Sequence, residues 1–250
     1  MNRKQALLLY LSGTFGQILL VSLLVWLLRA GEVRVDYGTP IGLFTLMLGG
    51  LSSAIWGAII SIRYHHSSFK QLVRDFFQVK QAPLNYLLVL IFIGLDFLPQ
   101  VFSGEMIIPT WYLPIILFVK ALVFGGIEEI GWRHFFQPTL QEKLTYLVST
   151  LCTFVAWSLW HLLYFYIDGS LARIHLLPFL LGLLSNCFIL SAIYTKTRSL
   201  WLCVMTHALI NALSQLSSTE ENLGLSLVIK VLIILFAMKI ASSSMEKVKS

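Results

Sequence analysis

Most of the polar residues that could do chemistry within the apolar stretches of this 250-residue chain gather in three short motifs. Ionisable side chains at the centre of a bilayer cost about 2.5–3.5 kcal/mol each, so those found in apolar runs are candidates for function. A carboxylate, two imidazoles and an amide that meet can activate a water molecule or hold a metal ion. The candidate residues of the three motifs are Glu128, Glu129, Arg133, His161, His207 and Asn211.

The spacing within the motifs predicts which side chains share a face. In the first motif, residues 125–133, Arg133 follows Glu129 by four residues, so on a regular helix the two side chains form an ion pair. Glu128 then points about 100° away and is left for other work. The glycines that flank these carboxylates allow another backbone to approach closely.

The other two motifs are simpler. His161 stands alone in the middle of an apolar run, whereas His207 and Asn211 lie four residues apart and should point at the same neighbour. Taken singly, each motif also has a structural explanation. The first could be a buried ion-pair network without chemistry, and the others could supply hydrogen bonds between helices.

The elements that must position these residues are membrane helices. The chain is 57% hydrophobic and only 12% charged, where soluble domains carry about 25% charged residues. A helix needs about 20 apolar residues to cross a bilayer. The sequence predicts an all-α, polytopic membrane protein, with residues 1–250 forming one integral membrane domain. The predicted spans are residues 6–28, 41–62, 83–103, 112–136, 144–167, 175–195, 199–216 and 223–240.

The charge pattern predicts the orientation of these eight spans. The formal net charge is +6, but the basic residues lie between apolar runs and form no stripe that would favour nucleic acid. If both termini are cytoplasmic, most of the 18 lysines and arginines fall on the inside, and only Arg29, Arg34 and Arg173 fall outside. At 1.5 Å per residue, the carboxylates and imidazoles lie about 12–25 Å from the cytoplasmic ends of their helices. They could therefore face one cavity.

The three motifs, in this order, resemble those of the CPBP intramembrane proteases, also called the Abi or type II CAAX-prenyl-protease-like family. The family pattern is EExxxR, FxxxH and then HxxxN or HxxxD, on separate membrane helices. The resemblance covers about residues 112–216, the expected catalytic core. Trp157 stands where the family usually has Phe, and an aromatic packing role survives that change.

The resemblance implies an intramembrane endopeptidase that hydrolyses a peptide bond of a membrane-associated protein or peptide. In the family, a glutamate and a histidine activate the water, a second histidine and an asparagine stabilise the oxyanion, and a glutamate and an arginine support the site. Carried over in that order, these roles fall on Glu128 and His161, His207 and Asn211, and Glu129 and Arg133.

The same resemblance leaves the chemistry of the water open. Family members are also described as metalloproteases, so a divalent metal such as zinc, held by Glu128, His161 and His207, is the alternative to a cofactor-free mechanism. We favour a glutamate-activated water, because the chain has no HExxH motif of the common zinc proteases. The expected partners are the lipid bilayer and a membrane-associated substrate, without nucleic acid. The short loops suggest a bacterial cell-membrane protein, with bacteriocin processing or self-immunity as candidate roles.

Two other classes of function compete with the protease. A non-catalytic membrane scaffold that binds a partner protein would need none of the four catalytic candidates. A proton-coupled transporter would use intramembrane glutamates and histidines as a proton relay, but the sequence shows no pseudo-repeat of the kind such folds carry.

Overall fold

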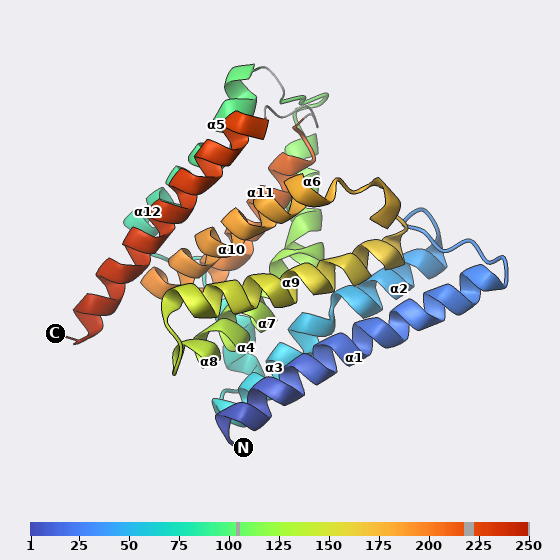
Figure 1. The fold of residues 1–250 in the computed structure, drawn as a ribbon, viewed down its shortest axis with the longest axis horizontal. Coiled ribbons are helices and arrows are strands. Elements are labelled where there is room, and N and C mark those ends of the chain that lie inside the picture. The colour runs from blue at the N-terminus through green and yellow to red at the C-terminus, as the bar shows by residue number, and fades with distance from the viewer. Residues whose placement is uncertain (104–105, 218–222, 250) are drawn as a thin grey trace. The chain divides into compact units, whose positions relative to one another are not determined.

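The computed structural model describes residues 1–103, 106–217 and 223–249, and helices dominate it (Figure 1). Within those ranges, the one β-type pairing is an isolated bridge between Met106 and Ser217. The predicted all-α class is therefore confirmed.

Five helical stretches of the described chain are long and apolar enough to cross a membrane. This finding supports a multi-pass membrane protein. Two further apolar helices are shorter, namely α11 (Leu200–Ser214) and the stretch Pro83–Phe97 of α5 (Pro83–Ser103). The five stretches are α1 (Arg3–Ala30), α2 with α3 (Pro40–Gly50 and Ser52–Tyr64), α9 (Tyr146–Asp168), α10 (Leu176–Thr197) and Gly224–Ser244 of α12 (Leu223–Lys249).

Residues 112–136, the fourth predicted span, do not form one regular helix, so the expectation of a continuous helix there was wrong. Helix α6 (Leu113–Phe124) ends at Gly125, whose backbone leaves the helical region at φ −148° and ψ −62°. Consecutive glycines are poor helix formers, so the break falls where the sequence is least helical. The chain continues as the 3₁₀ turn η1 (Gly126–Glu128), α7 (Glu129–Gly131), the π-helical turn η2 (Trp132–Phe136) and α8 (Gln137–Gln141).

The chain forms two compact units. The first comprises Met1–Leu72 and Ile130–Phe179, where α1 packs against α2, α3 and α9, and η2 packs against α3. The second comprises Val73–Glu129 and Leu180–Ser250, where α11 packs against α5, α6 and η1, and α12 packs against α5.

A polar bridge holds the first unit together where α2 gives way to α3. The Gln17 side chain of α1 donates to the Leu48 carbonyl of α2 at 2.6 Å and accepts from the Trp56 indole of α3 at 3.1 Å. Gly13 leaves room for that indole, because a Cβ atom there would lie 2.1 Å from the ring. Such bonds satisfy backbone groups in lipid, where no water can.

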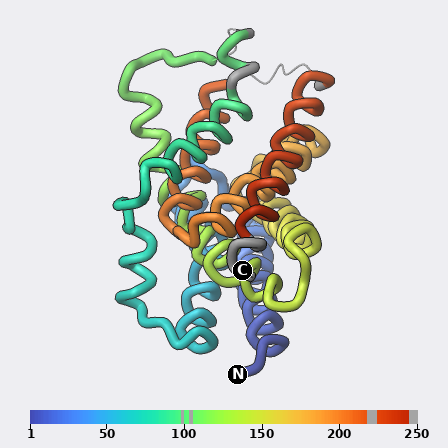
Figure 2. The backbone as a smooth tube through the Cα atoms, turned by 90° about the vertical axis from the view of Figure 1, so that its left-hand side faces the viewer, coloured from blue at the N-terminus to red at the C-terminus, as the bar shows by residue number. Residues whose placement is uncertain are grey.

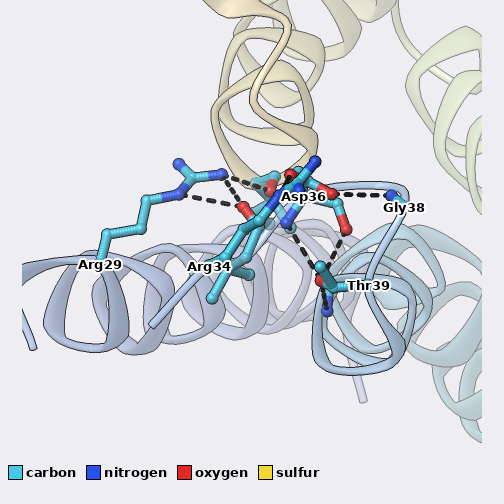
Figure 3. A network of polar contacts seen from close by, with 8 residues as sticks. Arg29, Arg34, Asp36, Gly38 and Thr39 are labelled. Atoms are coloured by element: carbon cyan, nitrogen blue, oxygen red, sulfur yellow. Dashed lines mark hydrogen bonds and ion pairs between the residues drawn. The ribbon is translucent and has the colours of Figure 1, made fainter. Parts of the chain in front are cut away.

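An arginine caps the far end of α9 in the same unit (Figure 3). The Arg29 guanidinium donates to the carbonyls of Tyr166 at 2.8 Å, Ile167 at 3.0 Å and Val35 at 2.7 Å. The last carbonyls of a helix have no partner within the helix, so a guanidinium placed there stabilises the helix end. The cap therefore ties α1 to α9.

The turn between α1 and α2 is built around Asp36. Its carboxylate accepts from the Arg34 guanidinium and from the Gly38 amide at 2.9 Å, while Thr39 donates from its hydroxyl to the Asp36 carbonyl at 3.0 Å (Figure 3). The Arg34 hydrogen bond, followed by that of Gly38, holds the pKa of Asp36 below its ordinary value of 3.8. A Cβ at Gly42 would lie 1.8 Å from the Asp36 carbonyl oxygen, so the turn packs directly on α2.

Candidate functional site

A buried carboxylate–imidazole pair forms the centre of the site in the second unit. Glu129, at the start of α7, lies 2.8 Å through Oε1 from Nδ1 of His207 on α11. The His207 side chain is 5% exposed and that of Glu129 is fully buried. The spacing of the first motif predicted Arg133 as the partner of Glu129, but it gave no sign of this contact with His207.

This pairing determines what the His207 ring can do. When the ring is neutral and Glu129 ionised, Nδ1 carries the hydrogen and donates it, and Nε2 keeps its lone pair. When the ring gains a second proton, Nε2–H becomes a donor and the adjacent carboxylate balances the charge. His207 can therefore accept a proton at Nε2 or donate one from it.

Asn211 reaches the same place as His207. A Cβ at Gly125 would lie 2.3 Å from Nδ2 of Asn211 and 3.2 Å from Nε2 of His207. The amide and the imidazole thus meet at the α-carbon of Gly125, as their spacing in the sequence predicts. A Cβ at Gly126 would lie 2.9 Å from the Val204 side chain of α11. The two glycines therefore let α11 approach the helix break closely, which only their lack of side chains permits.

In the first unit, His161 lies among aromatic rings on α9. Its Nδ1 is 2.9 Å from the carbonyl oxygen of Trp157. Because a carbonyl only accepts, Nδ1 of the neutral ring carries the hydrogen and Nε2 keeps the lone pair, which can accept a hydrogen bond from water. Rings of Trp157, Trp160 and Phe165 on α9 and of Phe179 on α10 lie within 6 Å of the His161 ring and restrict its plane.

Trp157 also stacks on the arginine of the first motif. The Arg133 guanidinium carbon lies 4.4 Å from the centre of the Trp157 ring, and both side chains are buried. A buried cation over an aromatic face gains an attraction that is strongest for tryptophan. This contact gives the tryptophan at the usual phenylalanine position a role. Neither motif alone pointed to it.

In the first unit, helix α3 packs against the residue next to His161 and against the segment that leads to Arg133. The Trp160 indole donates to the Ser52 hydroxyl at 2.9 Å, which fixes α9 next to His161. A Cβ at Gly131 would lie 2.2 Å from the Ser53 hydroxyl oxygen, so the chain just after the carboxylates also packs tightly on α3.

The candidate residues divide between the two units. The boundary falls after Glu129, inside the first motif. The expected Glu129–Arg133 ion pair stays a prediction. The second unit contains Glu128, Glu129, His207 and Asn211, and the first contains Arg133 and His161.

The metal alternative finds no prepared site. Within the residues that the structure describes, no three His, Cys, Asp or Glu side chains are arranged to hold a metal ion. Of the candidate ligands, Glu128 and His207 lie in the second unit and His161 in the first.

The fold and these buried polar groups define an all-α multi-pass membrane protein with a carboxylate–histidine centre. Residues 109–213 match the family model described as type II CAAX prenyl endopeptidase Rce1-like. The CAAX prenyl protease 2 of Methanococcus maripaludis is 25% identical, and the alignment covers 86% of each chain. The resemblance drawn from the three motifs is thereby confirmed, and at the level of the family it supports a protease.

Proposed function

We propose that this chain is an intramembrane endopeptidase that cleaves a peptide bond of a membrane-associated protein or peptide. The observation that carries the proposal is the buried pair of Glu129 and His207, with the Asn211 amide meeting His207 at Gly125. A chain that only packs against a partner needs no such buried polar groups, which are costly to keep in lipid.

In the proposed mechanism, Glu128 and His161 activate one water molecule. Glu128 takes a proton as the water oxygen attacks the scissile carbonyl carbon, and Nε2 of His161 orients the water. The carbonyl oxygen then becomes an oxyanion, which accepts hydrogen bonds from the Asn211 amide and from Nε2–H of His207. Glu128 returns its proton to the leaving amine, and the peptide bond breaks.

The support residues act on these groups. Glu129 holds Nδ1 of His207 and balances the ring's charge when Nε2 donates, much as a buried carboxylate orients a catalytic histidine. Arg133, stacked on Trp157, holds the segment that follows the two carboxylates.

The proposal also covers the membrane topology, the extent of the catalytic core, the location and the substrate class of the enzyme. We infer eight spans with both termini in the cytoplasm, one integral membrane domain, and a catalytic core over residues 112–216. The location is a bacterial cell membrane. Bacteriocin processing, self-immunity or maturation of a surface protein would suit it better than cleavage of a prenylated CAAX protein, although the relative's name refers to that substrate.

The experiment compares cells that carry the wild type with cells that carry Glu128→Gln. This change keeps the shape of the side chain and removes the base, so one or more membrane-associated proteins should remain uncleaved. Quantitative proteomics of peptide ends measures it. Glu142→Gln, which alters a carboxylate outside the three motifs, is the matched control. An identical set of peptide ends in wild type and Glu128→Gln would favour the scaffold instead.

A further inference from the structure

The connection between α3 and α5 contains a short helix, α4 (Phe69–Phe76), with two unlike faces. Figure 2 shows it as a short coil of the tube between residues 64 and 83. At 100° per residue, Phe69, Leu72, Val73 and Phe76 fall on one side of the helix, and the polar residues fall on the other. None of the three motifs involves this helix.

The apolar side of α4 is only partly covered by protein. Leu72 is buried at 3% exposure, but Phe69 is 68% exposed and Val73 is 40% exposed. Just past the helix, Phe77 is 63% exposed, with its ring 4.9 Å from that of Phe76. Exposed aromatic rings grouped in this way mark a surface that meets an apolar phase.

The charge around this apolar side is positive. Lys70 and Arg74 lie on the exposed flank of α4, and Arg63 and Lys80 lie on either side of the helix in sequence. The acidic residue of the helix is Asp75, 3.7 Å from the Arg74 guanidinium. An apolar face flanked by basic residues suits the boundary between acyl chains and anionic headgroups.

The length of chain before α4 keeps it close to the bilayer. The candidate membrane span Pro40–Tyr64 ends five residues before Phe69. An extended chain covers at most about 3.6 Å per residue, so α4 starts within about 18 Å of the end of that span. The headgroup region is therefore within its reach.

We propose that α4 is an interfacial anchor that lies in the headgroup layer of an anionic leaflet. Phe69 and Val73 insert toward the acyl chains, and Lys70 and Arg74 contact the lipid phosphates. This goes beyond the proposed function, because it assigns a lipid-binding surface that the hydrolysis does not use.

The test measures the depth of single spin labels in the full-length protein in nanodiscs. The three native cysteines, Cys152, Cys187 and Cys203, are first replaced. Labels at Phe69→Cys and Val73→Cys report the apolar side, and a label at Gln71→Cys is the matched control on the polar side. We expect oxygen-to-nickel-chelate accessibility ratios several-fold higher at the first two positions. Phe69 and Val73 labels open to the nickel chelate, or closed to both reagents, would overturn the proposal.

Varying the headgroup charge of the lipids distinguishes an anchor that prefers an anionic leaflet from one that binds through its apolar side alone. Labels at Phe69 should move deeper when phosphatidylglycerol replaces part of the phosphatidylcholine, and Lys70→Gln with Arg74→Gln should abolish that shift. An equal depth in both lipids would refute the anionic preference. Because depth is read without any cleavage assay, the result is independent of whether the chain is a protease.

Discussion

The two histidines of the site are both held through Nδ1, but by chemically different partners. His161 donates to a neutral backbone carbonyl, whereas His207 lies against a buried carboxylate. The first arrangement orients a ring that remains neutral. The second also balances the charge of a ring that carries a hydrogen on both nitrogens and donates from Nε2. This difference supports the separate roles proposed for the two rings, water activation and oxyanion stabilisation.

Substitutions at Glu129 should distinguish its role in orienting the His207 ring from its role in balancing the charge of that ring. Glu129→Gln keeps an acceptor for Nδ1 of His207 and removes the charge, so kcat should fall, while thermal stability should fall less than in Glu129→Ala. Glu129→Ala leaves a buried imidazole N–H without its partner, which costs about 1–3 kcal/mol. Unfolding in detergent and peptide cleavage measure the two effects. Equal stability losses in both variants would contradict this reading of the contact.

Gly125→Ala should abolish activity without unfolding the protein. The new Cβ would lie 2.3 Å from the Asn211 amide nitrogen, so that side chain must leave the position where it meets His207. Gly94→Ala is the matched control in the same unit, because a Cβ there meets nothing within 4 Å. Cleavage rates measured beside thermal melting curves test the prediction, and a fully active Gly125→Ala would show that Asn211 can act from elsewhere.

At the scale of elements, regular helices were predictable and irregular ones were not. The predicted span 144–167 closely matches α9, and the four-residue spacing placed His207 and Asn211 on one face of α11. The prediction of a regular helix after Gly125 was wrong, because 3₁₀ and π turns have no distinctive apolar period in the sequence. The contact of Glu129 with His207 arises from tertiary packing, which a single sequence does not encode locally.

The stacking of Arg133 on Trp157 links η2 to α9 and makes a graded prediction. Trp157→Phe keeps a smaller aromatic face and should lose little, whereas Trp157→Leu removes the face beneath a buried cation. A desolvated cation–π contact is worth about 2 kcal/mol, so Trp157→Leu should lower stability by at least that much. Trp111→Leu, at a position that is 82% exposed, is the control. Chemical unfolding in micelles measures both, and equal losses for Phe and Leu would rule out the stacking term.

At the scale of the whole molecule, contact with lipid explains why so many large apolar side chains are exposed on the surface. Large apolar side chains are widely exposed, among them Leu20 at 69%, Leu84 at 75% and Phe102 at 82%. Contiguous apolar patches on soluble proteins rarely exceed a few hundred Å². Arg29 and Asp36 instead lie at the turn after α1, where their hydrogen bonds fasten helices together. Polar interactions there should respond to pH, unlike the apolar contacts within the bilayer.

The Asp36 turn gives the whole fold a defined acid sensitivity. Since the folded pKa of Asp36 lies below 3.8, its carboxylate stabilises the protein above that value, and the contribution disappears as pH falls through the folded pKa. Asp36→Asn keeps an acceptor for Gly38 but loses the charge beside Arg34. Its melting temperature should therefore lie below that of the wild type at about pH 7 and converge with it as the pH falls through the folded pKa of Asp36. Glu32→Gln removes a charge from the same turn and should leave the melting temperature of the protein unchanged at neutral and at acidic pH. A wild-type advantage that persists in acid would show that hydrogen bonding alone holds the turn.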